Sequence, residues 1–144
     1  MGKPILQRQL EKLAVSLCVE KNIVFHGMLQ RNKLIDLLKS CHVKMMLSKE
    51  SSLGDVEGFG IAVLEANAVG LPAIGSKNTG IEDAIKDGFS GRLVTANNEN
   101  EIVNALIDIT ENYADYSLHA KEYAAQHDWK HIVKVYTKFF DELY

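Results

Sequence analysis

Two glutamates and two glycines lie close together at the start of an apolar segment of the chain. The run Glu57-Gly58-Phe59-Gly60 precedes four apolar residues, and Glu65 follows them. Glycine lets a ligand approach the backbone closely, and the free N–H groups of a helix N-terminus favour an anion, typically a phosphate. The two carboxylates can accept hydrogen bonds from hydroxyl groups. This combination suits a sugar joined to a nucleoside by a diphosphate.

The segment after these glycines predicts a buried helix. From Gly60 to Val69 only Glu65 and Asn67 are polar, and a helix that is apolar on all sides is a buried one. A buried carboxylate needs a hydrogen-bond donor from the protein or from a ligand. A structural alternative stays open, in which Glu57 interacts with the helix dipole and Glu65 pairs with a Lys or Arg. The usual dinucleotide and P-loop glycine patterns are missing from the sequence.

Strands and helices alternate along the chain up to residue 94. The apolar spacing predicts helices over residues 4–20, 31–41, 59–69 and 81–86, and strands over residues 22–26, 43–47, 72–75 and 92–94. This alternation predicts an α/β fold, a Rossmann-like parallel sheet with helices on both faces. Ligands bind beyond the carboxyl ends of the strands in such sheets, so the loops of interest are 27–31, 48–58 and 76–80.

Three further helices are predicted in the tail, over residues 102–109, 116–124 and 132–143. The last of them carries Tyr136, Phe139, Phe140 and Tyr144. We expect these aromatic residues to pack in the core, and the alternative is an exposed surface on which a partner docks.

The composition excludes several classes of function. The chain has 144 residues, which suggests one domain, and a formal net charge of −3, which gives no general attraction for nucleic acid. No stretch is long and apolar enough to span a membrane. The histidines are scattered, so no metal is expected. Cys18 and Cys41 are expected to be buried free thiols in helices, which fits a cytoplasmic location.

The order of motifs along nearly the whole chain resembles that of retaining glycosyltransferases of the GT-B type, particularly family 4. Glu57 and Glu65 match the E-x7-E motif of that family. The other matching segments are Gly2-Lys3-Pro4, Val24-Phe25-His26-Gly27, Gly70-Leu71-Pro72-Ala73-Ile74, Gly80-Ile81-Glu82, Asp87-Gly88-Phe89-Ser90-Gly91 and Trp129. The resemblance implies the C-terminal half of a GT-B fold, ending in a helical tail. Residues 1–144 would then be a single nucleotide-sugar-binding domain.

The resemblance also implies roles for individual residues. Glu57 is the candidate catalytic residue, which contacts the transferred sugar and stabilises its developing positive charge. Glu65 would hold the ribose hydroxyls, and the Phe59 and Gly60 amides would lie near the diphosphate or the sugar. The complete set of expected donor-binding residues is Gly27, Met28, Leu29, Glu57, Gly58, Phe59, Gly60 and Glu65. Glu82 is expected to support the neighbouring loop.

Some features of the family are replaced or missing. Thr79 stands where the family often has a second glycine, and Asn67 where it often has a small or apolar residue. We expect Asn67 to orient Glu65 or to satisfy a neighbour in its helix. The N-terminal acceptor domain and the start of the donor domain, with a pair of diphosphate-binding cations, have no counterpart, and Lys3 and Lys77 are the candidates to replace those cations.

The leading hypothesis is therefore a donor-binding domain, inactive alone, of an enzyme that moves a sugar from a nucleoside diphosphate-sugar to an acceptor. No cofactor or metal is implied. Peripheral association of the intact enzyme with a membrane stays open, and cell-surface polysaccharide assembly is the expected setting. Two alternatives remain: a non-catalytic module that binds a nucleotide-sugar or a partner, and an unrelated doubly wound domain such as a sugar-nucleotide epimerase fragment.

Overall fold

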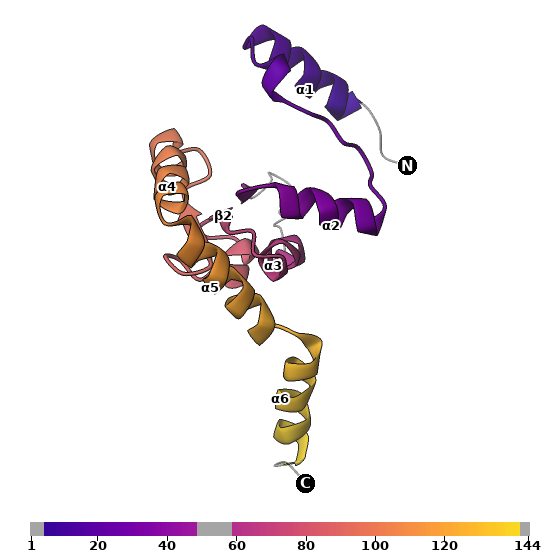
Figure 1. Cartoon of the computed structure of the whole chain (residues 1–144), viewed down its shortest axis with the longest axis vertical. Coiled ribbons are helices and arrows are strands. Elements are labelled where there is room, and N and C mark those ends of the chain that lie inside the picture. Colours follow the sequence, from indigo (N-terminus) through magenta and orange to yellow (C-terminus); the bar gives the residue numbers. More distant parts are fainter. Residues whose placement is uncertain (1–4, 49–58, 142–144) are drawn as a thin grey trace. The chain divides into compact units, whose positions relative to one another are not determined.

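The computed structural model describes residues 5–48 and 59–141 (Figure 1). Contacts divide the chain into two compact units, Met1–Leu34 and Ile35–Tyr144. The two units are described separately below.

The first unit is helical and has little core. Helix α1 (Ile5–Ser16) is followed by the short 3-10 helix η1 (Glu20–Asn22), and helix α2 (Arg31–Ser40) begins before the boundary between the units. In the described part of this unit, Ala14 is the buried apolar residue, with 3% of its surface exposed. Helix α1 is shorter than predicted because the backbone reverses at Cys18, which has a φ of 56°.

The strand predicted over residues 22–26 is wrong. The backbone at Ile23 is extended, with φ −120° and ψ 131°, but residues 23–26 belong to no strand of the described chain. Val24 is 72% exposed, although the prediction placed it in a buried strand. The β-branched residues favour an extended backbone, but a strand also needs a neighbouring strand that accepts and donates its backbone hydrogen bonds.

The second unit contains a parallel sheet of three strands. These are β1 (Lys44–Met46), β2 (Ala73–Ser76) and β3 (Gly91–Val94), in the order β1-β2-β3. Helix α3 (Ile61–Ala68) precedes β2, and the 3-10 helix η2 (Gly80–Ala84) lies between β2 and β3. Helices α4 (Glu99–Glu111), α5 (Tyr113–Gln126) and α6 (Trp129–Asp141) form the predicted tail. The parallel pairing confirms the prediction made from the alternation of elements.

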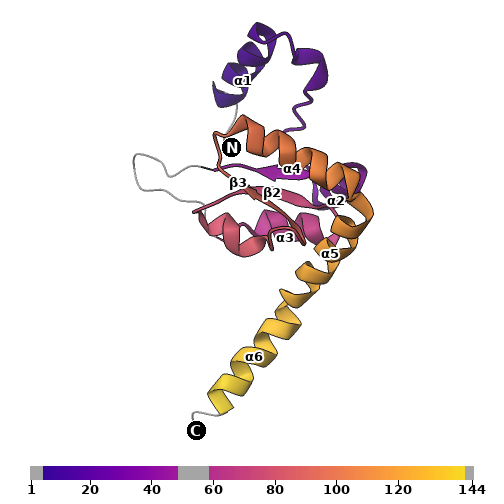
Figure 2. The same cartoon turned by 90° about the vertical axis from the view of Figure 1, so that its left-hand side faces the viewer.

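Helices cover both faces of this sheet, and successive residues of β2 point to opposite faces. Ala73 packs with Val63 of α3 and with Ile81, Ala84 and Ile85. Ile74 packs in a second cluster with Val94, Ala105, Ile109 and Tyr116. Figure 2 shows α3 and α4 on opposite sides of the strands. The core of the molecule therefore lies in two layers, one on each side of β2.

Two glycines are needed where backbone segments approach closely. A Cβ at Gly91 would overlap the carbonyl oxygen of Ala73 on the neighbouring strand. Gly70 ends α3 at a φ of 84°, as the sequence predicts, and a Cβ there would lie 2.9 Å from the Ser117 hydroxyl of α5. That hydroxyl donates a hydrogen bond of 2.7 Å to the carbonyl of Gly70, so the end of α3 is tied to α5.

The prediction of buried thiols is wrong for Cys18, which is exposed, while Cys41 is half-buried. Both cysteines lie just beyond the ends of helices rather than on their apolar faces. Helix packing therefore does not bury either thiol completely.

Candidate functional site

The turn that opens α3 is the best-defined part of the predicted site. Gly60 caps α3 in the left-handed conformation, with φ 73° and ψ 43°, where a side chain would be strained. It is buried against η2, since a Cβ at this position would lie 3.4 Å from Cα of Ile81 and 3.6 Å from Cβ of Ala84. The first N–H groups of a helix have no partner within the helix, and at this end of α3 they are those of Ile61 and Ala62.

The loop after β2 is held by several local hydrogen bonds. The Ser48 amide, just after β1, donates to the Ser76 hydroxyl at 2.9 Å, which joins the carboxyl ends of the two strands. The Thr79 hydroxyl donates to the carbonyl of Ser76 at 3.1 Å. The Asn78 amide donates to the Glu82 carboxylate at 2.8 Å. The supporting role predicted for Glu82 is thus confirmed. Thr79 stabilises the turn in which it lies, through its hydrogen bond to Ser76.

Glu65 is exposed, which corrects the prediction of a wholly buried helix. Helix α3 buries Val63, Ala66 and Asn67, while Ile61 is 66% exposed and Glu65 lies on the exposed side. Only one side of α3 packs against η2, the sheet and α5. The apolar composition of α3 therefore does not place the Glu65 carboxylate in the core.

The side chain of Asn67 bonds to the backbone rather than to Glu65. It is fully buried, and its side-chain amide donates to the carbonyl of Leu71 at 2.9 Å. This bond satisfies the backbone just after α3. Of the two roles expected for Asn67, the structure favours the one in which it satisfies a neighbour.

Lys77 is engaged by an acidic residue at the start of α4. Its ammonium lies 3.3 Å from the Glu101 carboxylate. The same carboxylate accepts a 2.9 Å hydrogen bond from the Thr95 amide, and these interactions lower the pKa of Glu101. A role of Lys77 toward a diphosphate would require it to leave this partner. Lys3, the other candidate cation, lies outside the described residues.

An aromatic contact joins the turn before α3 to the end of α5. The rings of Phe59 and His127 are 5.9 Å apart, and those of Tyr123 and His127 are 4.6 Å apart. The Tyr123 hydroxyl donates to the carbonyl of Asp83 in η2 at 3.1 Å. Burial, aided by the nearby Asp83 carboxylate, raises the pKa of Tyr123. This contact could not be predicted from the sequence, because Phe59 and His127 are far apart in the chain and belong to no common motif.

A second polar cluster ties three elements together away from the α3 turn. Arg92 of β3 and Tyr116 of α5 both donate hydrogen bonds to the carboxylate of Asp108 on α4. The bond from the Tyr116 hydroxyl, helped by Arg92, lowers the pKa of Asp108. Burial, together with this bond, raises the pKa of Tyr116. The cluster joins β3, α4 and α5 on one face of the sheet.

The structure brings some of the predicted donor-binding residues together. Phe59 and Gly60 form the turn before α3, and Glu65 lies in the middle of that helix, all within the second unit. Gly27, Met28 and Leu29 lie in the first unit, where Gly27 turns the chain at a φ of 63° and Met28 is 91% exposed. Glu57 and Gly58 lie outside the described residues, as does the loop from Lys49 to Val56.

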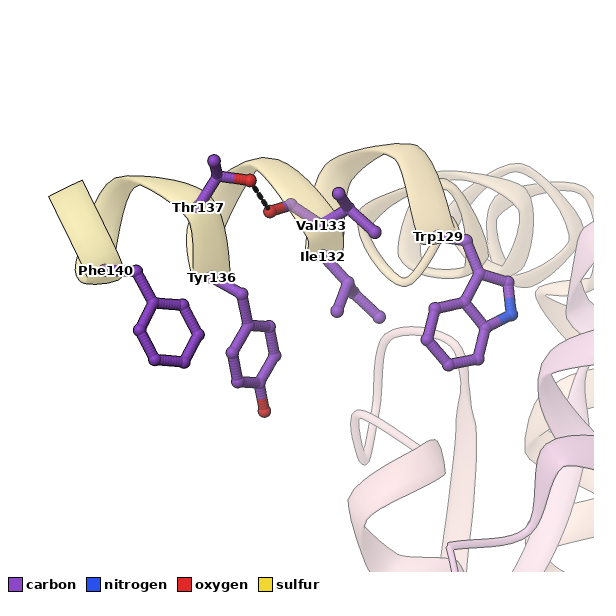
Figure 3. A pocket seen from close by; sticks show the side chains of 6 residues that line it. All are labelled: Trp129, Ile132, Val133, Tyr136, Thr137 and Phe140. Atoms are coloured by element: carbon purple, nitrogen blue, oxygen red, sulfur yellow. Dashed lines mark hydrogen bonds between the residues drawn. The ribbon is translucent and has the colours of Figure 1, made fainter.

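The apolar face of α6 is exposed, so the predicted core packing of its aromatic residues is wrong for those described. Tyr136, Phe139 and Phe140 are each more than half exposed, and Tyr144 lies outside the described residues. In Figure 3 the side chains of Trp129, Ile132, Tyr136 and Phe140 point to the same side of the helix. Lys121, Lys130 and Lys134 are also exposed, as expected of solvated positions.

The described residues meet neither the requirements of a metal site nor those of a membrane-spanning helix. Residues 5–48 and 59–141 contain no group of three or more His, Cys, Asp or Glu side chains placed to hold a metal ion. None of the helices described is both long and apolar enough to cross a membrane.

The sequence of the chain matches one family model. The family is described as Glycosyl transferases group 1, and the match covers residues 1–127. Among curated proteins, D-inositol 3-phosphate glycosyltransferase 2 of Catenulispora acidiphila is 28% identical over 123 residues, which is 83% of this chain and 27% of that protein. The chain spans about a quarter of the length of the curated relatives it matches.

Solved structures with low sequence identity share the fold of the chain. Sucrose-phosphate synthase from Thermosynechococcus elongatus superposes with a TM-score of 0.78 at 21% identity, covering 99% of this chain and 35% of that one. HepE from Anabaena, solved in complex with UDP-glucose, gives a TM-score of 0.75 at 22% identity, covering 94% of this chain and 36% of that one. These likenesses confirm the predicted α/β GT-B fold with its helical tail.

Proposed function

Because the chain belongs to the glycosyl transferase group 1 family, we propose that it is the donor-binding domain of a retaining glycosyltransferase. The intact enzyme moves a sugar from a nucleoside diphosphate to an acceptor, and the acceptor is bound by a part of the protein outside this chain. The single observation that carries the proposal is the family match over residues 1–127. The complex of HepE with UDP-glucose supports the nucleotide-sugar as ligand.

The diphosphate in this proposal lies at the N-terminus of α3. The left-handed Gly60 places the first turn of the helix against η2 and adds no side chain of its own at this end. Negative charge develops on the diphosphate as the sugar departs, and fixed N–H dipoles stabilise it without reorganisation. We assign backbone contacts with the diphosphate to Phe59 and Gly58 as well, and no metal is needed.

The two motif glutamates bind hydroxyl groups of the donor. Glu65 holds the ribose hydroxyls, a role that its exposed position on α3 suits. Glu57 contacts the transferred sugar and stabilises its developing positive charge as the catalytic residue. Gly27, Met28 and Leu29 border the base. Positioning of the donor is the main catalytic contribution of this domain.

Calorimetric titration of the chain with UDP, GDP and ADP, and then with their sugar conjugates, tests the proposal. We expect saturable binding that prefers one base. Replacing Glu65 by Gln removes a charged acceptor of hydroxyl hydrogen bonds, so the affinity should fall about 10- to 100-fold. Glu122→Gln is the matched control, because Glu122 is exposed on α5 and should leave the affinity unchanged.

Either of two results would contradict parts of the proposal. Unchanged affinity in a folded Glu65→Gln variant would remove the ribose role of Glu65. Absence of binding to every nucleotide at millimolar concentration, in both this chain and a longer protein containing it, would remove the donor-binding function itself.

A second candidate function is a partner-binding module without transfer activity. The observation that favours it is the exposed apolar side of α6, where Tyr136 is 62% and Phe140 is 56% exposed. A patch of this kind usually marks an interaction surface. The nucleotide titration separates the two candidates, since a pure partner-binding module gives no saturable binding of a nucleotide-sugar.

A further inference from the structure

Two elements pack against the turn that opens α3. On one side η2 supports Gly60, through Ile81 and Ala84. On another side α5 ends beside Phe59, with the ring of His127 at 5.9 Å and an interplanar angle of 44°. Phe59 itself is 42% exposed, so burial in the core does not fix its position. The contact with His127 is the aromatic interaction that restrains it.

The His127 ring is held in place by its own helix. Its Nδ1 lies 2.9 Å from the carbonyl oxygen of Tyr123. A carbonyl oxygen only accepts hydrogen bonds, so Nδ1 carries the proton and donates it. The centres of the Tyr123 and His127 rings are 4.6 Å apart, and the Tyr123 hydroxyl donates a hydrogen bond to the Asp83 carbonyl of η2. The His127 ring is therefore restrained by both α5 and η2.

We propose that His127 is a positioning residue of the donor site, which acts through Phe59 on the orientation of the first N–H groups of α3. The inference rests on the proposed function, because these N–H groups are the ones assigned to the diphosphate. Tyr123 assists by fixing the His127 ring. Neither residue touches the donor; both set the direction in which the first amides of α3, those of Ile61 and Ala62, point.

The geometry separates this role from ordinary packing. His127 is half-buried and Phe59 is partly exposed, so their contact removes little apolar surface from water compared with the core residues Val63 and Ile81. Loss of the His127 ring should therefore change the order of the turn more than the stability of the fold. His119, on the same helix, provides the comparison, since its ring stacks on Phe89 at 4.1 Å rather than on Phe59 of the turn.

The test compares His127→Ala, His127→Phe and His119→Ala in the full chain. Hydrogen exchange of the amides of residues 59–63 is measured without ligand, and UDP, GDP and ADP are titrated by calorimetry. We expect His127→Ala to raise exchange in this segment and to weaken binding of the preferred nucleotide about three- to ten-fold. His127→Phe keeps a ring beside Phe59 and should recover most of the affinity. His119→Ala should change neither reading.

The outcomes distinguish this inference from the proposed function. If His127→Ala and His119→Ala give the same exchange in residues 59–63, or if His127→Ala binds nucleotide as tightly as the unchanged chain, the positioning role is refuted. A loss of affinity that His127→Phe fails to recover would refute the role of the ring. If neither the unchanged chain nor a longer protein containing it binds a nucleotide, the proposed function fails, and the exchange data alone decide whether His127 orders the turn.

Discussion

Gly60 has a backbone conformation that few other residues adopt, and it sits where the proposed diphosphate binds. Its φ of 73° is matched by that of Gly88, at 70°, in the turn before β3. A Cβ at Gly88 would meet nothing within 4 Å, whereas one at Gly60 would contact Ile81 and Ala84. The two glycines therefore form a matched pair with similar strain and different surroundings.

Substitution of either glycine by Ala should lower the free energy of unfolding by about 1–2 kcal/mol, the cost of the left-handed conformation for an L-residue. Only Gly60→Ala should also weaken nucleotide binding, because only Gly60 caps α3. Urea unfolding and calorimetry measure the two effects. Equal losses of affinity in Gly60→Ala and Gly88→Ala would show that the turn at Gly60 has no special relation to the ligand.

Single residues differ in how well their environment follows from the sequence. The left-handed turn at Gly70 and the loop-supporting role of Glu82 are local, because their partners lie within a few residues or in the adjoining turn. The exposure of Glu65 depends on which side of α3 meets the sheet, and its apolar neighbours do not specify that side. The contact of Phe59 with His127 joins distant segments and has no local signal.

At the scale of elements, the Asp108 carboxylate connects α4 to β3 and α5. It accepts hydrogen bonds from Arg92 and Tyr116, and its pKa lies below the usual value. A carboxylate whose pKa is lowered by folding stabilises the folded state above its unfolded pKa of about 3.9. That contribution is lost as the pH falls through the lowered folded-state pKa.

Asp108→Asn should therefore reduce stability at pH 7 by about 1 kcal/mol, a modest value because the pair is partly exposed. The wild-type chain should lose stability as the pH falls below about 4, where Asp108 begins to be protonated in the unfolded state, and the variant should lose less. Urea unfolding as a function of pH measures both effects. Asp36→Asn, at an exposed position on α2, is the control, and identical pH profiles for the two variants would contradict the assignment.

Most of the elements could be predicted because their hydrophobic spacing agrees with their packing. The three strands of the sheet and the helices between them lie within a few residues of the predicted bounds. The segment 22–26 is predicted as a strand by its hydrophobic spacing, but residues 23–26 form none. Its residues favour an extended backbone, but pairing depends on a neighbouring strand, and hydrophobic spacing carries no information about that neighbour.

At the scale of the whole molecule, α6 carries the largest exposed aromatic residues. Trp129 is 77% exposed, and Tyr136 and Phe140 lie on the same side of the helix. We expect the chain to self-associate as its concentration rises, because an exposed apolar patch favours association. Sedimentation velocity across a concentration series measures this.

Phe140→Asp should reduce this association, while Lys134→Asp, which places the same side chain on the polar side of the same helix and changes the net charge by two units rather than one, should not. A monomeric unchanged chain at all concentrations, or equal effects of the two variants, would show that the exposed side of α6 does not drive association. Such a result would also weaken the partner-binding candidate.

The two cysteines of the chain lie one in each unit, Cys18 after α1 and Cys41 after α2. Because Cys18 is exposed and Cys41 is half-buried, a maleimide dye added in limiting amount should couple first to Cys18, and a second dye can then be coupled to Cys41. The natural sequence thus accepts a donor–acceptor fluorophore pair without mutagenesis. Energy transfer between the two dyes would follow the separation of the units when a nucleotide-sugar is added.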